Sequence, residues 1–209
     1  MTIDRAGYPF IGGTAVLAVA AAATVGSLGA VPLLILAAFF LYFFRDPNRP
    51  VPSEQHVMVS PADGAISDIT DLENYELLGG PAVRIGIFLS VFNVHVNRSP
   101  VSGRVTKVAF RKGRFLPAYH TDAAATNERS EVWVDHGGLP VVFRQIVGIL
   151  ARRVVCRVQP GAELKAGERF GIMKFGSRMD VFLPPNAQLN AKVGDTVVGG
   201  VTVIAVLIR

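Results

Sequence analysis

The feature that most constrains this chain is an uncharged, apolar run near its N-terminus. No Asp, Glu, Lys or Arg occurs in the 39 positions between Arg5 and Arg45, and the most apolar part covers residues 10–44. A helix needs about 20 apolar residues to cross a bilayer, so this run is generous for one span and tight for two. The preferred interpretation is a helical hairpin that turns near residues 26–32, and a single span is the alternative.

A cleaved signal peptide is the competing explanation of this run. The run is too long for the apolar part of a signal peptide, and the segment before it has only Arg5, which Asp4 opposes. Arg45 and Arg49 follow the run, and by the positive-inside tendency they place the rest of the chain in the cytoplasm. The sequence therefore predicts a membrane anchor at residues 1–45 and a domain at residues 46–209, on the cytoplasmic face of the cell (inner) membrane.

The composition after the run is that of an ordinary soluble domain. The whole chain is only 18% charged, whereas soluble domains have about 25% charged residues, and the apolar run accounts for the difference. Asp4 and Arg5 cancel, so the net charge of +5 belongs to the later part. Its aromatic and basic residues do not alternate along a face, which argues against nucleic acid as a partner. Anionic lipid explains the charge better. The single cysteine, Cys156, excludes a disulfide scaffold.

Short β-branched segments separated by Gly and Pro predict a mostly β domain. Two motifs recur: Ser60-Pro-Ala-Asp-Gly64 as Ser99-Pro-Val-Ser-Gly103, and Lys165-Ala-Gly-Glu168 as Lys192-Val-Gly-Asp195. Common turns before strands would explain one such echo, but two favour internal repeats. Such units resemble the barrel-sandwich hybrid folds of biotinyl and lipoyl carriers, and we expect a β domain of that kind. The expected strands cover residues 82–89, 101–111, 131–135, 140–147, 154–159, 179–183 and 197–208.

Few residues are candidates for chemistry. The sequence has no paired cysteines, no His-x-x-x-His, no carboxylate cluster at ligand spacing, no P-loop and no Gly-x-Ser-x-Gly, so no metal site is expected. His56 and His136 are expected in exposed turns and His120 in a polar loop. His95 lies in an apolar segment, where a core role is the more frequent one. The dipeptide Gly176-Ser177 lies between two strand-like segments, and an ordinary tight turn is its simplest interpretation.

Five segments in a fixed order give the chain a family resemblance. They are Ser60-Pro-Ala-Asp-Gly64, residues 88–103 around His95-Val-Asn-Arg98, Asn127-Glu-Arg129, residues 144–153, and residues 169–178 ending in Gly176-Ser177-Arg178. Together they resemble phosphatidylserine decarboxylase in its short prokaryotic form, over nearly the whole soluble domain. The longer bacterial form has Thr where Arg178 stands and a second histidine where Arg98 stands. The short form carries both changes, so they do not indicate lost activity.

The resemblance implies a proenzyme that cuts its own chain between Gly176 and Ser177. Ser177 Oγ would attack the Gly176 carbonyl, and elimination from the resulting ester would leave a β chain (1–176) and an α chain (177–209) that stay together as a heterodimer. The α chain would begin with a pyruvoyl cofactor made from Ser177, with no metal. Asp63 and His95 match the family's Asp and His positions, which form a triad-like set with the serine.

The implied reaction converts phosphatidylserine to phosphatidylethanolamine and CO₂. A Schiff base between the lipid amine and the pyruvoyl group would take up the electrons released with CO₂, and His95 would donate the proton. Arg98, Lys112 and Arg114 are expected to contact lipid phosphate, with plain surface charge as the alternative. The expected partner is membrane phospholipid, and the sequence leaves a homo-oligomer open.

Two other functions remain possible at this point. One is a non-catalytic, membrane-anchored carrier-like barrel, which explains the repeats and the anchor but gives Asp63, His95 and Ser177 no common role. The other is the cytoplasmic domain of a larger envelope assembly.

Overall fold

The structure is a computed structural model of the chain and describes residues 1–54, 56–76, 78–118, 120, 122–149, 153–174 and 177–208. Its internal contacts divide the chain into two compact units, Met1–Asn48 and Arg49–Arg209.

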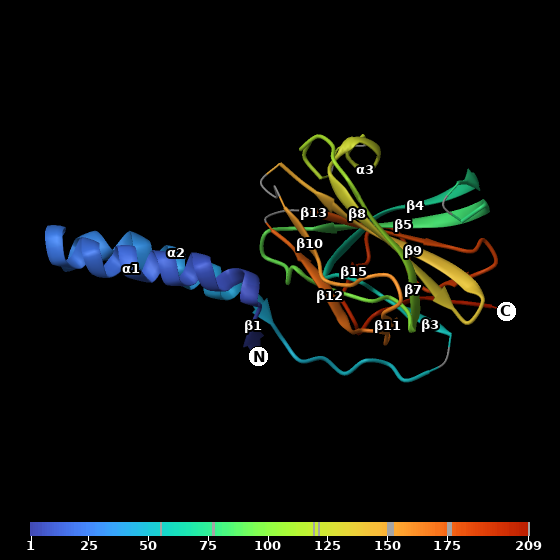
Figure 1. Cartoon of the computed structure of the whole chain (residues 1–209), viewed down its shortest axis with the longest axis horizontal. Coiled ribbons are helices and arrows are strands. Elements are labelled where there is room, and N and C mark those ends of the chain that lie inside the picture. The colour runs from blue at the N-terminus through green and yellow to red at the C-terminus, as the bar shows by residue number, and fades with distance from the viewer. Residues whose placement is uncertain are drawn as a thin grey trace. The chain divides into compact units, whose positions relative to one another are not determined.

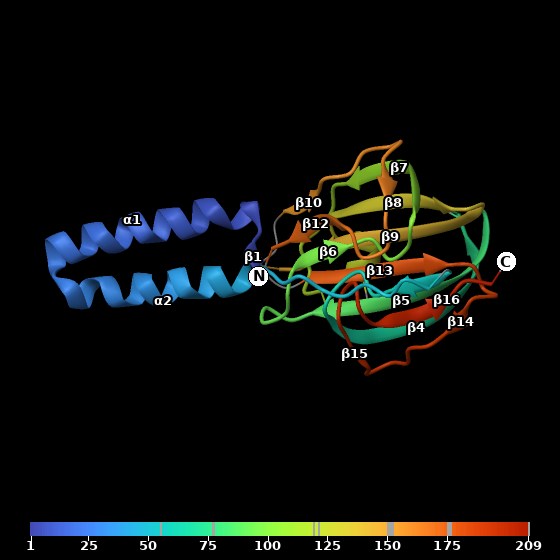
Figure 2. The ribbon, with the colours of Figure 1, turned by 90° about the horizontal axis from the view of Figure 1, so that it is seen from below.

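The first unit is a pair of antiparallel apolar helices, α1 (Tyr8–Val25) and α2 (Ser27–Phe43), seen side by side in Figure 2. Gly26, with φ of 96°, separates them. A short 3-10 helix η1 (Arg5–Gly7) precedes α1, and β1 (Thr2–Ile3) pairs with β2 (Arg45–Asp46). The ring of Phe10 lies 5.3 Å from that of Phe40. Residues Arg5–Val25 are long and apolar enough to cross a membrane, and α2 is a shorter apolar helix.

The second unit is built from antiparallel β-sheets (Figure 1), which confirms the prediction of a mostly β, sandwich-like domain. Its largest sheet has eight strands in the order β11-β7-β8-β9-β13-β5-β4-β15. Two three-stranded sheets, β10-β12-β6 and β14-β16-β3, complete it. The bounds of these strands are β3 (Val57–Val59), β4 (Gly64–Tyr75), β5 (Gly80–Leu89), β6 (Val96–Arg98), β7 (Gly103–Arg111), β8 (Arg129–His136), β9 (Leu139–Val147), β10 (Val154–Cys156), β11 (Glu163–Leu164), β12 (Arg169–Met173), β13 (Ser177–Leu183), β14 (Gln188–Leu189), β15 (Thr196–Val197) and β16 (Val203–Val206), with one short helix, α3 (Ala123–Thr126).

Strand β13 lies near the middle of the large sheet, paired with β5 on one side and β9 on the other. Because side chains alternate along a strand, Met179, Val181 and Leu183 point to one face, where they join the main hydrophobic core. Arg178 and Asp180 point to the other face. All seven residues of β13 are buried, so the strand is covered on both sides.

The fold contains an internal duplication that matches the first predicted echo. In the order of the large sheet, β11, β7, β8 and β9 of one half correspond to β15, β4, β5 and β13 of the other. The three-stranded sheets β10-β12-β6 and β14-β16-β3 correspond strand by strand in the same way. Ser60 Oγ donates to the carbonyl of Ala62 at 2.7 Å, and Ser99 Oγ donates to that of Val101 at 2.7 Å. The two motifs also bond each other reciprocally, from the Val59 N–H to the Pro100 carbonyl and from the Arg98 N–H to the Pro61 carbonyl.

The second echo is a shared turn but not the duplicated position. The Lys165 N–H donates to the Glu168 carboxylate and the Lys192 N–H to that of Asp195, both at 2.9 Å. However, Gly167 donates its N–H to the Ser99 carbonyl, and in the other half Gly200 donates to that of Ser60. The counterpart of the turn at residues 165–168 is therefore the turn at residues 198–201.

Most expected strands are present. The expected strand at 154–159 is shorter, as β10, and the short strands β3, β6, β11 and β14 were not expected. Two further differences concern longer segments. The expected strand at 197–208 is two strands, β15 and β16, because the turn at residues 198–201 interrupts it. Strand β4 was not expected as a twelve-residue strand, since its later part has Asp71, Glu73 and Asn74. These polar side chains are exposed, whereas Leu72 and Tyr75 of the same strand pack against a second core cluster of Trp133, Val142 and Phe182.

Candidate functional site

Ser177 is the first residue of β13 and is fully buried. Its backbone lies opposite Leu89 of β5 and Val147 of β9. Within the described part of the chain, its Oγ is a buried polar atom with no hydrogen-bond partner. Gly176, the other residue of the predicted cleavage bond, lies outside the described residues. The serine is nevertheless fixed in a central strand with its hydroxyl uncommitted, which is how a nucleophile awaiting its reaction would be held.

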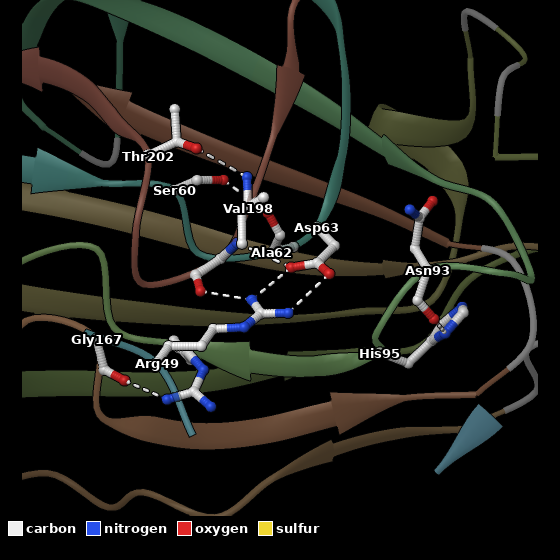
Figure 3. Close-up of polar contacts among 11 residues, drawn as sticks. Arg49, Ser60, Ala62, Asp63, Asn93, His95, Gly167, Val198 and Thr202 are labelled. Atoms are coloured by element: carbon white, nitrogen blue, oxygen red, sulfur yellow. Dashed lines mark hydrogen bonds and ion pairs between the residues drawn. The ribbon is translucent and has the colours of Figure 1, made fainter. Parts of the chain in front are cut away.

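His95 is buried, and one ring nitrogen has a fixed partner. Its Nδ1 lies 2.9 Å from the carbonyl oxygen of Asn93 (Figure 3). Because a carbonyl can only accept, Nδ1 carries the proton in the neutral ring and Nε2 is the basic nitrogen. Asn93 is itself held, since both the N–H and the Oγ of Ser90 donate to its Oδ1 at 2.9 Å. The loop after β5 thus fixes the tautomer that a general base requires.

Asp63 bonds to Arg49 and to the turn at residues 198–201. Arg49 donates to both carboxylate oxygens, at 2.5 Å and 2.8 Å, and the Gly199 N–H donates to Oδ1 at 2.9 Å (Figure 3). Arg49 also donates to the Gly199 carbonyl at 2.6 Å. The predicted partner of the His95 ring was Asp63, but Asn93 holds that place and, among the described residues, the Asp63 carboxylate does not bond to His95. A catalytic role of Asp63 stays a prediction.

The three segments carrying the predicted catalytic residues meet at one end of the large sheet. Ser177 lies opposite Leu89, the last residue of β5, and Ala65, two residues after Asp63, lies opposite Phe88. The carbonyl of His95 accepts the N–H of Met173, at the end of β12 and just before the cleavage region. Topology therefore brings Asp63, His95 and Ser177 to one region, although no direct bond joins their side chains within the described residues.

Arg49 was missed as a site residue. The sequence analysis used Arg49 only as an indicator of topology, whereas its side chain is only 8% exposed and bonds to Asp63. The signal in the sequence is weak, because a contact between a linker and a distant turn leaves no local pattern. Arg49 therefore does not count among the cations available to lipid.

The three predicted phosphate contacts have different surroundings. Arg98 is buried, and its Nη1 donates to the Gly167 carbonyl at 3.0 Å, so it fastens the duplicated turn. Lys112 and Arg114 are exposed in the segment after β7. The backbone of Arg114 is bonded to Thr126 and Glu128, which fixes the path of that segment. Lys112 and Arg114 are therefore accessible from solvent and Arg98 is not, and contact of Lys112 and Arg114 with lipid phosphate stays a prediction.

Arg178, the residue after Ser177, has two carboxylate partners, the buried Asp180 and the half-buried Asp68. Its Nε donates to Asp180 at 2.6 Å, and its Nη2 lies 2.7 Å from Asp68. A Cβ on Gly86 would overlap this Nη2, so the glycine makes room for the guanidinium. Burial raises the pKa of Asp180 against the opposing effect of Arg178. Burial also raises that of Asp68, but Arg178, Ser67 and Arg84 outweigh it and hold the Asp68 pKa below its ordinary value. These ion pairs secure the start of β13.

His56 and His136 differ from the expected exposed turn residues. Both are half-buried, their ring centroids are 5.7 Å apart, and both line a cavity of about 430 Å³. The cavity also borders Ser102, whose backbone carbonyl lies 2.6 Å from His136 Nδ1. Among the described residues, no cluster of three or more His, Cys, Asp or Glu side chains is placed to hold a metal ion.

Comparison with known proteins gives consistent similarities over almost the whole length. The family model described as phosphatidylserine decarboxylase matches residues 36–205. A protein named phosphatidylserine decarboxylase proenzyme from Symbiobacterium thermophilum is 45% identical over 97% of this chain and 94% of its own length. Proteins of the same name from Desulfotalea psychrophila and Nitrosomonas europaea are 40% and 41% identical, over 99% and 97% of this chain and 97% and 94% of their own lengths.

Proposed function

The chain belongs to the phosphatidylserine decarboxylase family, and from this premise we propose that it decarboxylates phosphatidylserine to phosphatidylethanolamine with a pyruvoyl group made from its own Ser177. The observation that carries this proposal is Ser177 itself, a buried serine with an unpartnered hydroxyl at the head of a central strand. A carrier-like barrel without catalysis has no use for such a residue.

The first stage is self-cleavage. Ser177 Oγ attacks the Gly176 carbonyl carbon as His95 Nε2 accepts the hydroxyl proton, and the peptide bond gives way to an ester with a free Ser177 amine. Loss of the Ser177 α-proton then expels residues 1–176 as a carboxylate and leaves a dehydroalanine. Addition of one water and release of ammonia turn the dehydroalanine into a pyruvoyl group.

The fold supports this chemistry on both sides of the cut. The hydrogen bond from His95 Nδ1 to Asn93 leaves Nε2 as the proton acceptor, as the first stage requires. After the cut, residues 177–209 remain bound because β13 pairs with two neighbouring strands. Ile204 and Leu207 also lie in the common core. The two fragments are thus expected to stay together as a heterodimer.

The second stage is the reaction with lipid. The pyruvoyl group would supply an electrophilic ketone that engages the lipid amine and takes up the electron pair released with CO₂. His95, in its protonated form, donates the proton that replaces CO₂. Lys112 and Arg114, exposed near the same end of the sheet, attract the lipid phosphate. Residues 1–45 anchor the enzyme in the membrane that contains its substrate, with the β domain on the cytoplasmic face of the inner membrane.

A denaturing gel with intact-mass measurement tests the proposal. The wild-type chain is expected to give a fragment of residues 177–209 with a blocked, pyruvoyl N-terminus, and to release CO₂ from phosphatidylserine vesicles. Ser177→Ala should stay whole and inactive. Ser130→Ala is the matched control, because Ser130 is also buried but donates to Gln145 at 2.7 Å, and it should still be cut.

Two outcomes would contradict this assignment. A wild-type chain that stays whole under every condition would favour the carrier-like barrel. Normal cleavage in His95→Ala would remove His95 from the first stage and leave it only the proton transfer to substrate.

A further inference from the structure

The face of the large sheet opposite Ser177 has two clusters of charged side chains. The first is balanced. Arg178 contacts both Asp180 and Asp68, and Arg84 donates to Asp68 at 3.0 Å. Two guanidinium groups therefore meet two carboxylates, and no further ion is needed for neutrality.

The second cluster is not balanced. Three arginines surround one carboxylate, that of Glu131, whose side chain is 2% exposed. The Nε atoms of Arg129 and Arg144 lie 3.0 Å and 2.9 Å from Glu131 Oε1, and that of Arg111 lies 3.7 Å from Oε2. The side chains of Arg129 and Arg144 are 18% and 12% exposed, so two positive charges with little access to water share one negative charge. Buried charge without a counter-charge is costly, and this cluster has an excess of cations.

A cavity of about 390 Å³ opens onto this second cluster. Tyr75 lines it, and within the described residues the Tyr75 hydroxyl is buried without a hydrogen-bond partner. Burial raises the pKa of this hydroxyl, so it stays protonated and able to donate. Asn74 and Glu76 complete the rim.

The arginines present donors that the protein itself does not use. Among the described contacts, the Nη atoms of Arg111 and Arg144 donate to no protein acceptor. The guanidinium of Arg144 lies over the ring of Phe182, 4.7 Å from its centroid, which holds it in one orientation. Planar guanidinium groups held in place suit the paired oxygens of a phosphate group.

We propose that this arginine cavity, formed by Arg111, Arg129, Arg144 and Tyr75, binds a phosphate group, either of a free anion or of a lipid head group. The site is separate from the reacting centre. Cross-strand partners lie on one face of a sheet, and Asp180, Arg144 and Glu131 are such partners. Ser177, an odd number of residues from Asp180, points to the opposite face, so the ligand here is not the amine or carboxylate being processed.

Titration of the full chain in a nonionic detergent tests this site. Inorganic phosphate is one probe, and short-chain phosphatidic acid, compared with short-chain phosphatidylcholine, is the other, with binding measured by calorimetry. Arg111→Gln should weaken binding of the preferred probe by about tenfold, as expected for loss of a charged hydrogen-bond donor. Arg111 is the safest variant for folding, because its side chain is 54% exposed. Tighter binding of phosphatidic acid than of phosphate identifies a lipid site, and the reverse order identifies a free-anion site.

Two further variants separate a built site from general attraction to positive charge. Glu131→Gln removes the competing carboxylate and should tighten binding severalfold if the variant retains wild-type circular dichroism. Arg84→Gln removes an arginine from the balanced cluster and should leave the affinity unchanged. Equal weakening by Arg84→Gln and Arg111→Gln, or no saturable binding of either probe, would overturn the proposal. Self-cleavage is not the readout, so the outcome does not depend on the proposed decarboxylation.

Discussion

The two halves of the β domain share one backbone design but only one of them forms the proposed reaction centre. Gly64 and Gly103 occupy the same place in the two motifs, with φ of 156° and 154°. A Cβ on Gly64 would lie 2.2 Å from the Phe88 carbonyl oxygen, and one on Gly103 would lie 2.2 Å from that of Asp135. Even the strand irregularities match, since pairing shifts register after Ile66 and after Val105.

The side chains at equivalent positions explain the different outcome. Ser102 accepts the Ala166 N–H at 2.9 Å, as Asp63 accepts that of Gly199. Ser102 adds no charge, whereas Asp63 brings in Arg49 as well. His56 precedes β3 as His95 precedes β6, but His56 lines an outer cavity while His95 is fully buried. The comparison teaches that the duplicated backbone supplies only the framework, and that a few buried polar side chains distinguish the half that carries the proposed site.

The largest expected difference between the halves is in stability at Asp63 and Ser102. Asp63→Ala leaves the buried guanidinium of Arg49 without its carboxylate, which should cost about 3–5 kcal/mol. Ser102→Ala removes one neutral hydrogen bond and should cost about 1 kcal/mol. Urea unfolding of the full chain in detergent, followed by the fluorescence of Trp133, measures both. Similar losses in the two variants would mean that the Arg49 ion pair adds little.

Replacement of the two motif glycines, Gly64 and Gly103, should cost the same stability in both halves, because the backbone around them is the same. Gly64→Ala and Gly103→Ala each place a methyl group against a backbone carbonyl, so each should lose about 3 kcal/mol of unfolding free energy. Gly80→Ala is the control, since a Cβ there meets nothing within 4 Å. Tolerance of Ala at one motif and not at the other would show that the duplication is only approximate.

These glycine positions also show what the sequence reveals of this fold. The Ser-Pro-x-x-Gly echo was detectable because a backbone that closely approaches another carbonyl excludes every residue with a Cβ. The correspondence between the turn at residues 165–168 and the turn at residues 198–201 was not detectable from the sequence. Backbone hydrogen bonds define this correspondence, and the two turns share only one glycine position. Strand β4 was not recognised because its outer half has only two partly buried apolar side chains, Leu72 and Tyr75, among exposed polar residues.

In the candidate site, too, some residues were predictable from the sequence and their partners were not. Ser177 and His95 were identified through a family motif, and both prove to be buried at one end of the sheet. Their local partners were not identified, because Asn93 contributes a backbone carbonyl, which any residue could supply. The contact of Arg49 with Gly199 and the ion pair of Arg178 with Asp68 join segments far apart in the chain, which a single sequence does not record.

The stability of the chain at acidic pH should depend on Asp68, a charged residue in the first half of the domain. The pKa of Asp68 is held below the ordinary 3.8, so its stabilising effect is full above that value and is lost as pH falls through the lower, folded pKa. Asp180 acts in the opposite sense, because its raised pKa means that protonation relieves the cost of its burial. Asp68→Asn should therefore lose less stability than wild type between about pH 4 and about pH 2. Urea midpoints across this range provide the measurement, and an unchanged slope would contradict the pairing of Asp68 with Arg178.

The smallest expected effect is at Lys107, which occupies the place of Asp68 in the second half. There the ion pair is replaced by a cation over an aromatic ring, with Lys107 Nζ 4.8 Å from the centroid of Trp133. Lys107→Met keeps an unbranched side chain of similar reach but removes the charge, so it should cost about 0.5–1 kcal/mol. Lys192→Met, at an exposed turn, is the matched control and should stay within about 0.5 kcal/mol of wild type. Because the Lys107 side chain is itself exposed, its replacement should leave self-cleavage intact. A loss at Lys107 as large as that at Asp63 would instead mean that the second half is held together by charge as strongly as the first.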